Sequence, residues 1–167
     1  SADTMTAVVG NITFDASHDI IAATAISTGD TVTMKAGNHL TATNLNAGTL
    51  TTAAGNIDLN AVQNITANSV TANGSATMTA GQDITTTTIK AGTKATMTAG
   101  RNLTATDIDA GTVIDMTTTT GSMKLKQVKT TGTIGNNIAK AGTDLSVDDM
   151  TASSAIDLTA GENITAN

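Results

Sequence analysis

The sequence predicts an all-β fold: a single-stranded right-handed parallel β-helix (β-solenoid) of about eight triangular coils, each 19–20 residues long. A repeat of about 19 residues runs through the chain, apolar and polar residues alternate inside each repeat, and the composition is rich in Thr and Ala, with 15 Gly and no Pro. The clearest repeat is Gly81–Ala99 (GQDITTTTIKAGTKATMTA), followed at once by Gly100–Thr118 (GRNLTATDIDAGTVIDMTT). We therefore expect residues 1–167 to form a single β-helical repeat domain, a fragment or repeating segment of a longer fibre.

The composition argues against a compact globule and against disorder. Phe14 is the only aromatic residue, so the core must be built from Ala, Ile, Leu, Val and Met. A disordered low-complexity tract has no reason to keep apolar residues at fixed spacing along the whole chain.

Each repeat contains one apolar residue that we call the anchor. The anchors are Ile20, Leu40, Ile65, Ile84, Leu103, Met123, Leu145 and Ile164. A second apolar position lies five residues after the anchor and is occupied by Leu45, Val70, Ile89, Ile108, Val128 and Met150. In the first repeat the apolar residue is Ile26, one place late. Six residues before the anchor comes a third, with Met116 one place early: Phe14, Met34, Leu59, Met78, Met97 and Leu158.

These spacings predict three short arms per coil and an interior column of side chains. A period near 19 is too short for a two-helix repeat and fits one coil of a solenoid, with coils stacked at roughly 4.8 Å. Gly before the anchor, as in GNH, GQD, GRN and GEN, and Gly in AGT predict corners, because Gly permits positive φ. Asn64, Asn102 and Asn163 share one corner position and predict a mixed ladder of stacked amides.

Two coils carry extra residues, which we expect to form surface loops at Leu50–Gly55 and Gly132–Asn137. An insertion in a solenoid is expelled at a corner, where it either forms a neutral bulge or carries binding. The candidate interaction residues are Leu50, Thr51, Thr52, Gly132, Thr133 and Ile134.

Charged residues provide a test of the register. In the predicted alignment Lys90, Asp109 and Lys129 lie on three successive coils, and Lys126 lies beside Asp148. We expect these to be exposed pairs of small energetic value.

Several function classes are disfavoured. The net charge of −6, without a basic run, argues against nucleic acid, and no apolar run approaches the ~20 residues that span a bilayer. We expect no cofactor and no metal, since Cys is absent and His18, Asp19 and His39 read as separate polar corner residues. The start of the chain lacks the features of a signal peptide.

The phrases AGNHLTATNL, AAGNIDLNAVQNITANSV, AGQDITTTTIKAGTKATMTAGRNLTATDIDAGT and AIDLTAGENITAN resemble the repeats of filamentous-haemagglutinin-type exoproteins of Gram-negative bacteria. The resemblance implies a right-handed parallel β-helix on a long fibre, secreted or held at the cell surface after two-partner secretion. The family's Asn-Pro-Asn-Gly secretion motif is absent, since the chain has no Pro. The resemblance thus implies a stalk.

We therefore expect a non-enzymatic shaft segment of an adhesin or contact-dependent toxin stalk. Its partners would be neighbouring coils or end-to-end copies, and a host-cell or neighbouring-cell receptor or glycan. A self-assembling extracellular filament subunit is one alternative. A further alternative is a polysaccharide-active enzyme using Asp107 and Asp109, although the chain lacks Trp and Tyr for sugar stacking. Another is an ice-binding solenoid using Thr77, Thr79, Thr96 and Thr98, although other residues interrupt this Thr array on other coils.

Overall fold

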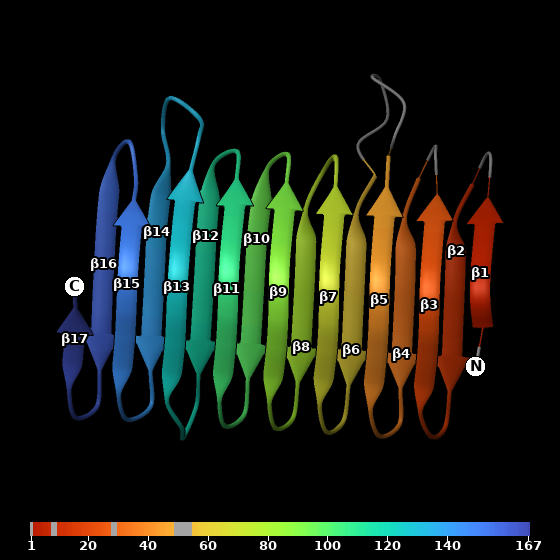
Figure 1. The fold of residues 1–167 in the computed structure, drawn as a ribbon, viewed down its shortest axis with the longest axis horizontal. Helices are drawn as coiled ribbons and strands as arrows, with labels where there is room; N and C mark the ends of the chain where they lie inside the picture. The colour runs from red at the N-terminus through yellow and green to blue at the C-terminus, as the bar shows by residue number, and fades with distance from the viewer. Residues whose placement is uncertain (1, 8–9, 28–29, 49–54) are drawn as a thin grey trace.

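A computed structural model describes residues 2–7, 10–27, 30–48 and 55–167 of the chain. These residues form seventeen β-strands and no helix. The strands make two parallel sheets, one of the odd-numbered and one of the even-numbered strands, and the chain passes from one sheet to the other at every turn (Figure 1). The predicted parallel β-solenoid of about eight coils is confirmed.

The odd-numbered strands form the nine-stranded sheet: β1 (Ala2–Ala7), β3 (Ile20–Ser27), β5 (Leu40–Ala47), β7 (Ile65–Ala72), β9 (Ile84–Ala91), β11 (Leu103–Ala110), β13 (Met123–Thr130), β15 (Leu145–Thr151) and β17 (Ile164–Ala166). The even-numbered strands form the eight-stranded sheet: β2 (Ile12–Ala16), β4 (Val32–Ala36), β6 (Ile57–Ala61), β8 (Ala76–Ala80), β10 (Lys94–Ala99), β12 (Val113–Thr118), β14 (Asn136–Ala141) and β16 (Ala155–Ala160).

The winding is right-handed. In Figure 1 the odd-numbered strands lie in front and run upward, the even-numbered strands lie behind and run downward, and the coils advance from right to left. Parallel crossovers almost always have this hand, because right-twisted strands pack back onto the sheet that way.

The three predicted arms are present, but they belong to two strands rather than three. In β5 the burial pattern runs buried, exposed, buried, then shows two neighbouring outward residues, Thr43 and Asn44, before Leu45 is buried again. Because strand side chains normally alternate, two outward neighbours mark a bend that divides the strand into two arms. The third corner therefore needs no loop.

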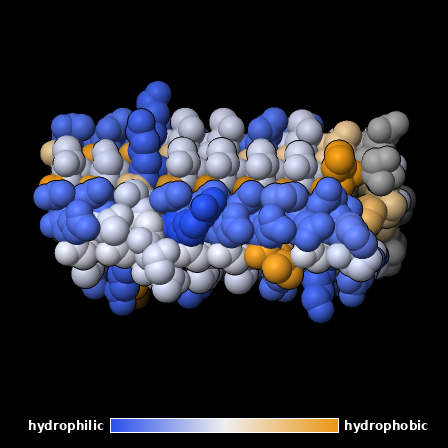
Figure 2. All heavy atoms as spheres, turned by 90° about the horizontal axis from the view of Figure 1, so that it is seen from below, coloured by the Kyte–Doolittle hydropathy of each residue, from blue (hydrophilic) through white to orange (hydrophobic). Residues whose placement is uncertain are grey.

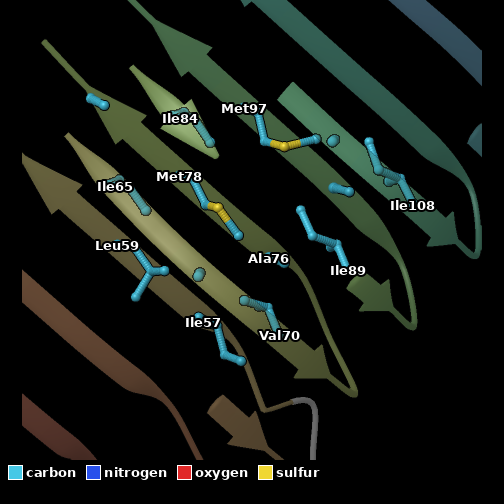
Figure 3. Packing of buried hydrophobic residues seen from close by; sticks show 14 of the residues in the cluster. Ile57, Leu59, Ile65, Val70, Ala76, Met78, Ile84, Ile89, Met97 and Ile108 are labelled. Carbon is cyan, nitrogen blue, oxygen red and sulfur yellow. The ribbon is translucent and has the colours of Figure 1, made fainter. Parts of the chain in front are cut away.

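The predicted columns are confirmed, with one correction. All eight anchors are cross-strand partners in a single register. Leu59, Met78 and Met97 form a row between the sheets, each no more than 1% exposed (Figure 3). The assignment of Ile26 to the second column is wrong, because Ala25 pairs with Leu45 and Ile26 faces outward beside Asn46.

Most of the corner glycines are explained by close approach of the coils and not by positive φ. Among the described residues, only Gly10 and Gly48 have positive φ. A Cβ added to Gly100 would lie 2.0 Å from the carbonyl oxygen of Gly81 in the preceding coil. The expected positive φ is confirmed at Gly48, in the first AGT corner, and is wrong for the other predicted corner glycines, which give clearance between stacked coils.

The polar ladder before the anchors bonds side chains to backbone. The Oδ1 atom of an Asn or Asp accepts the backbone N–H at the same position of the next coil, so the residue on that next coil can be of any type except Pro. The four bonds are His39 to Asp19 (3.1 Å), Asp83 to Asn64 (3.0 Å), Asn102 to Asp83 (3.1 Å) and Ser122 to Asn102 (3.0 Å). This rule explains why the ladder tolerates a mixed sequence.

Candidate functional site

The two insertions lie at the same corner of the solenoid, where the chain leaves an odd-numbered strand. The register offset rises from 20 residues at Ser27–Ala47 to 25 at Val32–Ile57, so the first insertion falls between Ala47 and Ile57. Its predicted interaction residues Leu50, Thr51 and Thr52 lie outside the described residues.

The second insertion is described in full. The offset rises from 20 residues at Ala110–Thr130 to 23 at Val113–Asn136, which adds three residues between β13 and β14 (Figure 1). Residues 131–135, which we call the corner loop, contain the predicted Gly132, Thr133 and Ile134, and Ile134 is 71% exposed. The predicted range 132–137 runs too far, because Asn136 and Asn137 already belong to β14.

The corner loop is held by the coil that follows it. The Ser153 hydroxyl donates to the carbonyl oxygen of Gly132 at 2.6 Å and accepts the Gly135 N–H at 2.7 Å. Backbone bonds from Thr131 to Ala110 and from Ser154 to Gly135, both 2.9 Å, tie the loop to its two neighbours. A loop fixed in this way presents Ile134 without a large ordering cost on binding.

A shallow groove lies beside this loop, over the preceding coils. It is lined by Ala72, Lys90, Ala91, Gly92, Asp109, Gly111 and Thr131. Its glycine positions cannot carry a side chain, because a Cβ on Gly111 would lie 2.0 Å from the carbonyl oxygen of Gly92. The groove therefore has a backbone floor, with polar side chains at its sides.

The predicted charge register is confirmed, but the ion pairs are not. Asp109 is the cross-strand partner of both Lys90 and Lys129. Among the described residues no N···O distance of 4.0 Å or less joins these three, nor Lys126 to Asp148. Exposed side chains of this length lose more rotamer entropy than a solvated pair returns.

Ion pairs form elsewhere in the described part of the chain. Lys94 Nζ lies 3.6 Å from Asp115 Oδ2, and Arg101 Nη2 lies 2.6 Å from Asp83 Oδ2. Burial alone would raise the pKa of Asp83. The Arg101 hydrogen bond, the Asn102 N–H, the Arg101 charge and the Asn102 amide outweigh it, so the pKa of Asp83 lies below its usual value.

The other candidates are dispersed along the rod. Asp107 and Asp109 both lie on β11, and Asp107 pairs with Thr88 and Gln127 rather than with a second carboxylate. The His18 ring nitrogen lies 3.1 Å from the Ser17 hydroxyl. No group of three or more His, Cys, Asp or Glu residues that could hold a metal occurs in the ranges described.

Sequence reasoning missed a set of buried polar residues at the base of the corner loop. Thr130 is 4% exposed and Asn137 is 0% exposed. The signal was present, because four preceding coils have Ala where Thr130 stands: Ala47, Ala72, Ala91 and Ala110.

Comparison with known proteins identifies no relative: no family model, curated protein or solved structure matches the chain. Within the described ranges, no helix has the length and apolar character needed to cross a bilayer.

Proposed function

We propose that this chain is a shaft segment of a filamentous-haemagglutinin-like adhesin, secreted or held at the surface of a Gram-negative bacterium. The observation that carries the proposal is the unbroken register, in which every odd-numbered strand from β1 to β15 pairs with the next odd-numbered strand. A rod built from nearest-neighbour contacts can be lengthened coil by coil, each coil adding roughly 4.8 Å.

The surface suits a solvated shaft. Figure 2 looks onto the edge of the rod formed by the turns that precede the odd-numbered strands. Most of this edge is hydrophilic or neutral. The described exposed large hydrophobic residues include Val62, at 64% exposure, and Ile134, at 71%. The corner loop, rather than a broad apolar face, is thus the proposed point of contact with a receptor or glycan on another cell.

The shaft role is tested by removing one whole period. Deleting residues 81–99 joins Ala80 to Gly100, which stands at the same coil position as Gly81. The proposal expects a folded rod shorter by roughly 4.8 Å, because the cut keeps every column in phase. A matched deletion of residues 81–94 breaks the phase and should unfold the flanking coils. Equal tolerance of both deletions would contradict a shaft made of in-phase coils.

The contact role is tested with beads coated with the chain and exposed to epithelial and bacterial cells. Ile134→Ser should weaken attachment, while Val62→Ser, which alters a similarly exposed apolar residue at the opposite corner, should leave it unchanged. Absence of attachment by the unaltered chain would reject the adhesive part of the proposal and leave the shaft part to the deletion test.

A second candidate is a self-assembling filament subunit, since stacked parallel coils fit end-to-end association of copies. Ile156 is 48% and Ile164 is 49% exposed, although their cross-strand columns are buried elsewhere, as at Leu145 with 1% exposure. Another copy stacked on this coil would bury both. Electron microscopy of the purified chain separates the two: long filaments that shorten with Ile164→Lys support the subunit, and short rods at every concentration reject it.

A further inference from the structure

The buried side-chain oxygens without a protein partner are concentrated at one place. In the described residues they are Thr86 Oγ1, Thr130 Oγ1, Asn136 Oδ1 and Asn137 Oδ1. Three of these four flank the corner loop, at the end of β13 and the start of β14. Buried polar atoms in native proteins are almost always bonded to protein or to ordered water, so this clustering requires an explanation.

Thr130 and Asn137 point into the solenoid interior. Thr130 occupies a column of Ala residues, and Asn137 lies between Ile114 and Ile156 in the first interior position of the even-numbered strands. Neighbouring strand residues face opposite sides, so Asn136 does not share this interior space. The two interior oxygens form the candidate pair.

Their geometry places the two side chains at the same corner. A Cβ added to Gly135 would lie 2.3 Å from Thr130 Oγ1, so the hydroxyl packs against the last residue of the corner loop. Asn137 follows two residues later. Its Nδ2 donates to the carbonyl oxygen of Thr151 at 2.8 Å, which fixes the orientation of the amide and directs Oδ1 away from that carbonyl.

We infer that an ordered water molecule binds between Thr130 Oγ1 and Asn137 Oδ1, inside the solenoid and beneath the corner loop. Water donates to Asn137 Oδ1 and either donates to Thr130 Oγ1 or accepts its hydroxyl, which gives it two protein partners, within the two to four typical of buried water. The two oxygens are neutral, so they would not offset the cost of burying a cation.

The water explains why Thr130 and Asn137, at the two ends of one loop, are both polar where the preceding coil has apolar residues. The corner loop adds three residues at this corner, and a bridged polar pair fills the space that an Ala and an Ile fill in the preceding coil. The bound water also joins the two ends of the loop, because Thr130 precedes it and Asn137 follows it. This inference rests on the buried oxygens and not on the proposed adhesive function.

Two matched variants test the water bridge by urea unfolding. Thr86→Ala removes the other unpartnered buried hydroxyl, at a position where both flanking coils have Ala. It should leave the urea midpoint unchanged or raise it. Thr130→Ala also restores an Ala column, yet it should lower the midpoint, because it breaks a water bridge and leaves Asn137 Oδ1 unpaired. A midpoint that rises equally in both variants would overturn the inference.

A crystal structure of the unaltered chain gives a readout independent of folding. Density for one water within hydrogen-bonding distance of Thr130 Oγ1 and Asn137 Oδ1 is expected. A direct bond between the two side chains would overturn the inference. An anomalous peak at this point in crystals grown with thallium(I) would overturn it in favour of a monovalent cation.

Discussion

Met78→Ala tests most directly how much the interior column contributes to the free energy of unfolding. Met78 is 1% exposed and pairs with Leu59 on one side and Met97 on the other. Truncation removes a buried thioether and leaves a cavity between two rigid sheets. Large-to-small core substitutions of this kind cost about 2–5 kcal/mol.

Two control variants separate burial from strand propensity. Thr79→Ala alters the next residue of β8, which faces solvent, and should change the free energy of unfolding by less than about 0.5 kcal/mol. Leu158→Ala alters the same interior column at the last coil, where Leu158 is only partly buried. Its cost should fall between the other two, because less apolar surface is buried there.

Circular dichroism during urea unfolding suits a chain without Trp or Tyr. Stacked repeats can unfold in parts, so amide hydrogen exchange should accompany it and should show lost protection centred on β6, β8 and β10. A Met78→Ala cost no larger than that of Thr79→Ala would refute the interior column. Loss of protection spread evenly over all coils would refute nearest-neighbour stacking.

Three further predictions concern the corners. Gly100→Ala should destabilise the fold by about 1–3 kcal/mol, measured by urea unfolding, because its Cβ overlaps the Gly81 carbonyl oxygen, whereas Val62→Ala in the same column should be nearly neutral. Because the pKa of Asp83 is lowered in the folded state, its contribution to stability is complete well above pH 3.8 and is lost as the pH falls through the folded-state value. Asp83→Asn should therefore flatten the acid limb of a stability profile against pH, and an unchanged limb would contradict this. Ile134→Ser should leave the melting temperature within a degree or two of the unaltered chain, since an exposed loop tip adds little to stability, and a marked drop would show that the loop packs against the core.

The fold could be predicted because the repeat is strict where the interior is narrow. The anchors and the Met78 column follow directly from apolar spacing, and Met116 joins that column although its turn is one residue out of step. Ile26 was misplaced because side-chain size was followed instead of the five-residue spacing of the other coils, which results from the bend inside the strand. The smaller Ala25 faces inward, and its neighbour faces out.

Other features depend on contacts between coils, which a linear sequence does not display. The glycine at position 100 could be recognised as a corner, but its cause is the carbonyl oxygen of Gly81, one coil away. Lys90 and Lys129 were placed correctly beside Asp109, but the register alone does not require exposed lysines to form ion pairs with it. The bend at Thr43 and Asn44 carries no Gly or Asn-Gly signal, because it is made inside a strand.

The position of the candidate site was predicted from the sequence, but the hydrogen bonds that hold the corner loop were not. An insertion between repeats must be expelled at a corner, which located Gly132, Thr133 and Ile134. The Ser153 contacts lie on the following coil and could not be inferred from the loop itself.

Disulfide trapping between neighbouring coils tests the stacked register most directly. Thr79 and Thr98 are outward cross-strand partners, so their Cα atoms lie roughly 4.8 Å apart, within the range that a disulfide spans. The chain has no native Cys. Mild oxidation of the Thr79→Cys/Thr98→Cys double variant should link it within one chain, while Thr79→Cys/Thr117→Cys, two coils apart, should stay reduced. Equal linking of both pairs, or of neither, would contradict a solenoid stacked in this register.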